Sequence, residues 1–244
     1  MEGKLAGKLL VDMAKHKGMP EEKVKMLEFA FLEYEDHIEA YGFCLSENPD
    51  QLSQWRGYAD DGRGVSIGFT TDFLEQTEGA MLNRIKYKDA EHEKILRPIF
   101  SKFDELASTG ALDRPSKGTI LVPKLQEVYE QEKVQYERNV KRFLLMFFEI
   151  LPKLFFLKSQ AFMEELEWRL VALYENFTNE HKEIDFHAVS DLIKPYTERA
   201  ICDKGIKEII LGPKNRTPIN TVKALLNNNG FMNVEVRISD SSYR

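Results

Sequence analysis

Apolar residues recur at helical spacing in three parts of the chain. One stripe follows the period of an α-helix over residues 21–39, and Pro20 stands just before it, where a helix can begin without losing a hydrogen bond. Further stripes cover residues 96–106 and about 120–150. We expect the last helix to stop at Pro152, because proline lacks the N–H that would continue it. The spacing predicts a helical N-terminal region and a helical middle.

Alternation of apolar and polar positions predicts strands on both sides of this middle. Before it, candidate strands cover residues 41–45, 65–69 and 82–87. In the second of them glycine or serine fills every other position, so one face has almost no side-chain volume and another part of the chain should approach it closely. After the middle, the sequence predicts strands at 165–174, 196–202, 206–211 and 234–238, with a helix at 217–230.

Together these elements predict an α+β fold with a mixed or mainly antiparallel sheet and a helical insertion. The sequence contains no internal repeat and no long Gly/Ser/Pro linker, so we interpret residues 1–244 as a single domain. In this interpretation residues 1–40 form N-terminal helices, 41–88 the first half of the sheet, 89–157 the helical insertion and 158–244 the second half of the sheet.

Composition excludes several classes of protein. The chain is 43% hydrophobic and 30% charged, which is typical of a globular domain with a full core. Its two cysteines cannot make a disulfide scaffold, and this usage fits a reducing, cytoplasmic compartment. The net charge of −6 provides no overall attraction to nucleic acid or anionic lipid. The apolar run 143–157 is shorter than the roughly 20 residues that cross a bilayer, so we expect no membrane partner.

The segment Glu165-Leu-Glu-Trp-Arg-Leu-Val is the most informative for chemistry. Read as a strand, it places Glu165, Glu167 and Arg169 on one face. Arg169 can hold one carboxylate ionised while the other keeps a different pKa, which is how neighbouring acids take separate roles. The alternative is a solvated face with charges paired across strands. The opposite face, expected in the core, carries Leu166, Trp168 and Leu170.

A second candidate is the short helix predicted after residue 50. It gathers Trp55, Arg56 and Tyr58 beside the glycine-rich strand. The guanidinium suits a phosphate or carboxylate, and the aromatic rings offer a stacking surface, so the three together fit a nucleotide site. The alternative is structural, with Trp55 as a core anchor and the other two covering the edge of the sheet.

Other candidate chemistry is less specific. The five histidines lack zinc-site spacing and there is no glycine-rich phosphate loop, so we expect no metal and no permanently bound cofactor. Cys44 and Cys202 lie in apolar candidate strands and are expected to pack rather than react. Asp60 and Asp61 suit a turn before Gly62. A basic cluster within residues 204–223 is expected to be solvated, with a nucleic acid backbone as the alternative partner.

Several blocks resemble a bacterial family, the domain of unknown function 2971. They are Phe43-Cys-Leu-Ser-Glu, then Leu52-Ser-Gln-Trp-Arg-Gly-Tyr-Ala-Asp-Asp-Gly-Arg-Gly-Val-Ser-Ile-Gly-Phe, the Glu165 segment, Ile206-Lys-Glu-Ile-Ile-Leu-Gly-Pro and the closing Ser242-Tyr-Arg. The resemblance covers roughly residues 41–244. It implies an uncharacterised protein and does not assign an activity.

The Glu165 segment is also similar to the glutamate-bearing strand of ADP-ribosyltransferases. That resemblance implies NAD or a related nucleotide as substrate, in a bacterial toxin or phage-defence role. Glu167 would steady the positive ribosyl centre formed as nicotinamide leaves, with Glu165 as the accessory acid and Arg169 beside them. Members of the DUF2971 family usually begin with a Tyr-[His/Arg]-Tyr-Thr-like strand, and the comparison with the transferases implies that this strand supplies a residue gripping NAD. The first forty residues of this chain contain no such motif, which puts NAD binding in doubt.

Two other functions remain open. The chain can be a non-catalytic interaction domain that lacks this first strand and forms oligomers through the helices of residues 120–150. It can also be a metal-dependent nuclease or hydrolase, with a divalent cation held by Asp60, Asp61, Glu165 and Glu167.

Overall fold

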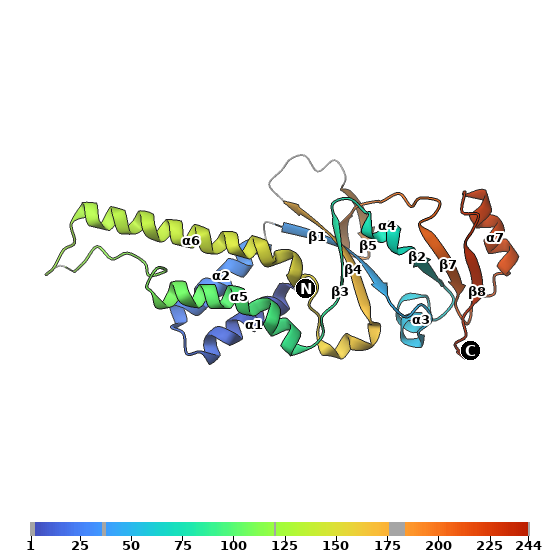
Figure 1. Ribbon diagram of the computed structural model, residues 1–244, viewed down its shortest axis with the longest axis horizontal. Coiled ribbons are helices and arrows are strands. Elements are labelled where there is room, and N and C mark those ends of the chain that lie inside the picture. The colour runs from blue at the N-terminus through green and yellow to red at the C-terminus, as the bar shows by residue number, and fades with distance from the viewer. Residues whose placement is uncertain (1–2, 36–37, 120, 176–183, 244) are drawn as a thin grey trace. The chain divides into compact units, whose positions relative to one another are not determined.

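The computed structural model describes residues 3–35, 38–119, 121–175 and 184–243. By its contacts the chain divides into two compact units (Figure 1). Unit 1 consists of residues 1–38 and 86–160, and unit 2 of residues 39–85 and 161–244. The segment interpreted as a helical insertion, 89–157, lies within unit 1 together with the N-terminal helices, a grouping that the sequence pattern did not indicate.

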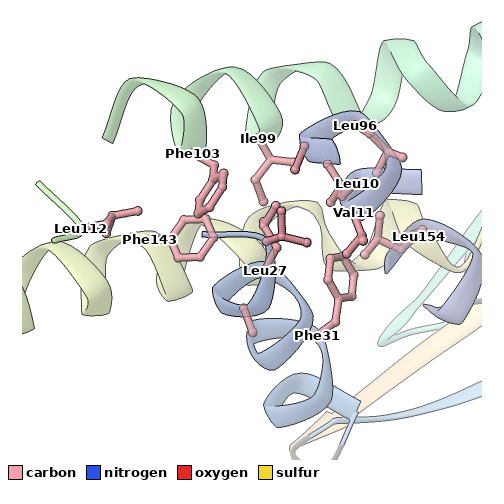
Figure 2. Packing of buried hydrophobic residues seen from close by; sticks show 14 of the residues in the cluster. Leu10, Val11, Leu27, Phe31, Leu96, Ile99, Phe103, Leu112, Phe143 and Leu154 are labelled. Atoms are coloured by element: carbon pink, nitrogen blue, oxygen red, sulfur yellow. The ribbon is translucent and has the colours of Figure 1, made fainter. Parts of the chain in front are cut away.

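Unit 1 is a helical bundle whose core draws one apolar stripe from each helix (Figure 2). Its helices are α1 (Gly3–His16), α2 (Glu21–Glu35), α5 (Asp89–Ser108) and α6 (Gln126–Leu154). On α5 the side chains of Leu96, Ile99 and Phe103 follow helical spacing and are buried. The Phe103 and Phe143 rings pack in the core with centroids 4.9 Å apart. Burial of each such side chain contributes roughly 1.5–3 kcal/mol.

Helix α6 differs from the sequence prediction at both ends. It begins at Gln126, whereas the predicted start, Ile120, lies outside the described residues. It continues through Pro152 to Leu154, so the prediction that the helix stops at Pro152 is wrong. Near the end of a helix a proline removes only one backbone hydrogen bond. Burial of Leu154, which is 2% exposed, stabilises the final turn.

The described residues of unit 2 form two three-stranded sheets and a hairpin. The first sheet has the order β1-β4-β3, formed by Ile38–Ser46, Glu167–Glu175 and Ala80–Arg84. The second has the order β2-β7-β8, formed by Val65–Phe69, Ile206–Leu211 and Glu235–Ile238. The hairpin pairs β5 (Asp185–Val189) with β6 (Leu192–Tyr196).

Helices lie between these strands: α3 (Leu52–Tyr58), α4 (Thr71–Glu75), the 3-10 helix η1 (Gln160–Glu165) and α7 (Ile219–Asn228). The pairs β2–β7, β3–β4 and β5–β6 are antiparallel. The pair β7–β8 is parallel, and α7 provides the crossover that a parallel connection needs. The predicted α+β class is confirmed. No helix in the described ranges is long and apolar enough to cross a membrane.

The close approach predicted at the glycine-rich strand is present in β2. Gly68 pairs with Glu208 of β7, and a Cβ atom on Gly68 would lie 2.6 Å from the Cγ atom of Glu208. Any side chain at Gly68 would therefore displace Glu208.

Two predictions for unit 2 are wrong. The strand expected at 196–202 does not form, because the hairpin ends at Tyr196 and residues 197–205 lie outside strands. Cys44 and Cys202 are exposed rather than packed. Cys44 lies on β1, which is the outer strand of its sheet, and Cys202 lies in the irregular segment before β7.

Candidate functional site

Unit 2 contains a cleft of about 630 Å³, within the range typical of small-molecule sites. Its walls come from β1 and the loop after it, from α3 and from β2, with further residues from β3, β4 and β7. Tyr58 is the most exposed aromatic residue of the cleft, with 75% of its surface accessible. The aromatic residues that line the cleft are Phe43, Trp55, Tyr58, Phe69 and Trp168.

Hydrogen bonds to carboxylates fix the orientation of both indole rings. The Trp168 Nε1–H donates to Glu47 Oε1 at 2.8 Å, and the Arg84 guanidinium donates to the other oxygen of Glu47 at 3.0 Å. The Trp55 Nε1–H donates to Asp50 Oδ1 at 2.6 Å. Because its N–H is used in this way, the half-buried Trp168 ring offers a fixed flat surface to the cleft, whereas the Trp55 ring, 2% exposed, is packed into the cleft wall.

Charged side chains lie beside these rings. Glu47, Lys207 and Glu208 all line the cleft. The Arg237 guanidinium donates to Glu208 Oε2 at 3.4 Å, so this carboxylate is paired with a cation next to β2. The cleft therefore combines aromatic surface with hydrogen-bond acceptors and one ammonium group.

The structure separates the three charged residues predicted to share a strand face. Glu167 and Arg169 lie together on β4, where they are 4% and 5% exposed. Their pairing is bidentate, with Arg169 Nε 2.5 Å from Glu167 Oε1 and Nη2 3.1 Å from Oε2. Glu165 instead ends η1, and Leu166 follows it with a positive φ of 45°. The alternation of β4 thus begins only at Glu167.

The two faces of β4 are not those that the sequence suggested. The face with Glu167, Arg169 and Val171 is buried, and neither Glu167 nor Arg169 is among the residues that line the cleft. Trp168 lines the cleft, whereas Leu170 lines a neighbouring cavity of about 480 Å³. The face of β4 with Trp168 and Leu170 therefore lines the cleft and the neighbouring cavity, and the face with Glu167 and Arg169 is the more buried one.

The three α3 residues predicted to form a nucleotide site do not all face the cleft. Trp55 and Tyr58, three residues apart on one helix face, both line the cleft. Arg56 lies on a different side of α3, with its guanidinium 5.8 Å from the centre of the Tyr243 ring. The Tyr58 hydroxyl is 3.5 Å from Glu165 Oε1, so the structure brings one member of each predicted trio together at the rim of the cleft.

Asp61 lies in a turn that is held by hydrogen bonds from Lys214 and Tyr243. Asp60, Asp61 and Gly62 all have positive φ values. The Tyr243 hydroxyl donates to Asp61 Oδ1 at 2.5 Å, and the Lys214 ammonium donates to Oδ2 at 2.9 Å. These hydrogen bonds hold the pKa of Asp61 below its usual value. Among the residues that the structure describes, no three His, Cys, Asp or Glu side chains form a group that could hold a metal ion.

This lowered pKa predicts a pH-dependent contribution to stability. The Asp61 interaction is complete above the unfolded-state pKa of about 4 and is lost as the pH falls through the folded-state pKa. Asp61→Asn should be less stable than wild type at about pH 6, and the difference should shrink toward about pH 2. Urea unfolding followed by tryptophan fluorescence measures it, because both tryptophans lie in unit 2. A difference independent of pH would contradict the assignment.

Sequence reasoning missed the charged residues of the cleft and the residue that supports α3. Glu47 was present in the Phe43 block but carried no separate signal. Lys207 and Glu208 line the cleft because β7 pairs with β2, a pairing that the sequence pattern did not indicate. Asp50 only marked the start of the predicted short helix, whereas its carboxylate accepts hydrogen bonds from the Trp55 indole and from the Ser239 hydroxyl, 189 residues away in the sequence.

Part of the chain matches a family model. Residues 54–170, a little under half of the chain, match the family described as "Protein of unknown function (DUF2971)". This range contains most of α3, all of β2 and β3 and the start of β4, and therefore several walls of the cleft. Searches of the curated proteins and of the solved structures found no match. Over these residues the chain is similar to the DUF2971 family, whose name assigns no activity.

Proposed function

We propose that unit 2 binds a nucleotide in the cleft beside β2, with NAD as the first ligand to test. The observation that carries the proposal is the fixed, half-buried Trp168 indole and the exposed Tyr58 ring next to charged groups in one cleft of suitable volume. Flat aromatic surfaces favour stacking of a nucleobase, and each stacked base is worth roughly 1–3 kcal/mol.

The polar lining supports the same ligand class. The Lys207 ammonium suits a phosphate oxygen, and the Glu47 carboxylate suits the hydroxyls of a ribose or the amino group of a base. Apolar side chains of β2 complete the wall, with Val65 and Ile67 44% and 43% exposed. A ligand that stacks on the rings would cover this apolar surface as well.

ADP-ribosyl transfer remains a prediction. It would require a carboxylate near the ribose carbon from which nicotinamide leaves. Glu167 is buried and paired with Arg169, whereas Glu47 lines the cleft and Glu165 contacts Tyr58 at its rim. If nicotinamide release is observed, we expect Glu47→Gln or Glu165→Gln to reduce it while nucleotide binding is retained.

Calorimetric titration with NAD and with ADP tests the binding proposal. Tyr58→Ala should weaken binding by about 5- to 100-fold, because it removes one stacking surface. The matched control is Phe186→Ala: Phe186 is an aromatic residue of the same unit, 67% exposed and outside the cleft. This control should bind like wild type. Absence of binding of both ligands to the folded wild type, or equal losses in the two variants, would contradict the proposal.

A further inference from the structure

Helix α6 presents a solvent-facing stripe that the bundle of unit 1 does not use. Residues 126–138 are exposed except for the half-buried Tyr129 and Tyr136. In Figure 1 this N-terminal part of α6 extends past the end of α5. A helix with little packing depends on side-chain pairs or on a partner for support. The exposed residues that share the outward stripe are Glu127, Glu130, Val134, Arg138, Lys141 and Leu145.

Charges on this stripe are arranged symmetrically about Val134. Glu127 and Lys141 stand seven residues before and after it, and Glu130 and Arg138 stand four residues before and after it. The acidic side chains thus occupy one end of the stripe and the basic ones the other. Val134 at the centre is an apolar residue with 53% of its surface exposed. Such a stripe is complementary to itself when a second copy runs in the opposite direction.

We propose that α6 pairs with α6 of a second copy as an antiparallel, two-fold symmetric contact centred on Val134. In this register Glu127 faces Lys141 of the other copy, and Glu130 faces Arg138. Each contact occurs twice, and the two Val134 side chains meet on the axis. Within the described residues Glu127, Arg138 and Lys141 make no ion pair in the single chain, so they are available for these contacts.

The expected association is weak and sensitive to salt. Its ion pairs are exposed, and such pairs contribute little individually and are screened by salt. We expect a dissociation constant between about 1 µM and 1 mM for a contact of this kind. Sedimentation velocity at up to about 500 µM protein should therefore show a concentration-dependent dimer, which about 0.5 M NaCl weakens. A strict monomer over this range would overturn the proposal.

Cysteine crosslinking tests the register. In a Cys44→Ser/Cys202→Ser background, Val134→Cys places two thiols on the symmetry axis, within reach of a disulfide. Mild oxidation should give a covalent dimer. The matched control is Glu130→Cys, which lies on the same stripe but four residues from the axis. It should crosslink much less, and equal crosslinking of the two variants would overturn the register.

Charge reversal tests the pairing without covalent chemistry. Glu127→Lys/Glu130→Lys makes the stripe wholly basic, and Arg138→Glu/Lys141→Glu makes it wholly acidic. Each variant alone should be monomeric, because the stripe then repels its copy, whereas an equimolar mixture should dimerise. The control Lys94→Glu/Arg97→Glu reverses two exposed charges on α5 and should dimerise like wild type. A mixture that stays monomeric, or a control that loses the dimer, would contradict the assigned surface.

Discussion

Replacing Glu167 by alanine should lower the free energy of unfolding of unit 2 by about 3–5 kcal/mol. The Arg169 guanidinium, 5% exposed, would lose its bidentate carboxylate and remain buried. A buried charge without its main partner is costly because it has given up its hydration and gains little in return. Arg169→Ala should lower the free energy of unfolding by a similar amount, since it leaves the buried Glu167 carboxylate without this guanidinium.

The matched control replaces both partners by apolar residues of similar size. Glu167→Leu/Arg169→Met should be more stable than either single alanine variant, because no buried charge is left uncompensated. Urea unfolding followed by the fluorescence of Trp55 and Trp168 reports on unit 2 alone. Single variants as stable as wild type would show that this pair does not hold β4 in place.

This prediction also affects how any loss of activity in a Glu167 variant is interpreted. The sequence resemblance implies a catalytic role for Glu167, whereas its position in β4 favours a structural one. A Glu167→Gln variant that loses both stability and activity supports the structural role. One that keeps its stability and its nucleotide affinity but loses turnover supports the catalytic role.

Replacing Asp50 by alanine should lower the free energy of unfolding of unit 2 by about 3 kcal/mol. Its Oδ1 atom accepts hydrogen bonds from the Trp55 indole at 2.6 Å and the Ser239 hydroxyl at 2.5 Å, and Oδ2 accepts one from the Asp240 N–H at 2.7 Å. Burial acts to raise the pKa of Asp50, but the hydrogen bonds and Arg237 outweigh it and lower the pKa. Removing the carboxylate leaves the buried Trp55 N–H without an acceptor.

Asp240→Ala is the matched control for this variant. The Asp240 side chain is 96% exposed, and its loss should change stability by no more than about 0.5 kcal/mol. The backbone N–H that Asp50 binds is unchanged in this variant. Equal effects of the two substitutions would mean that Asp50 does not connect α3 to the end of β8.

The limits of sequence reasoning are clearest at β4. Alternation at Glu167, Trp168 and Arg169 correctly placed the two charged residues on one face, because side chains alternate across any strand. It could not decide which face is buried. A cleft with an aromatic lining exposes Trp168, whereas a bidentate ion pair allows Glu167 and Arg169 to be buried. Apolar character was therefore a poor guide to burial in the wall of this cleft.

Local features were predicted better than contacts between distant segments. Gly68 carried a signal because only a residue without a side chain tolerates Glu208 at that distance. The partners of Asp61, Lys214 and Tyr243, lie more than 150 residues away in the sequence and have no local pattern. Helix α6 passes Pro152 because tertiary packing of Leu154 outweighs the local preference to stop.

A nucleotide that stacks beside Trp168, as proposed, should change the tryptophan fluorescence of the protein. Titration of wild type with NAD or ADP should quench the emission saturably, because Trp168 lines the cleft. Trp168→Phe retains only Trp55, which is 2% exposed, and should lose most of this quenching. Emission that does not change at millimolar nucleotide, or equal quenching in the two proteins, would contradict the claim.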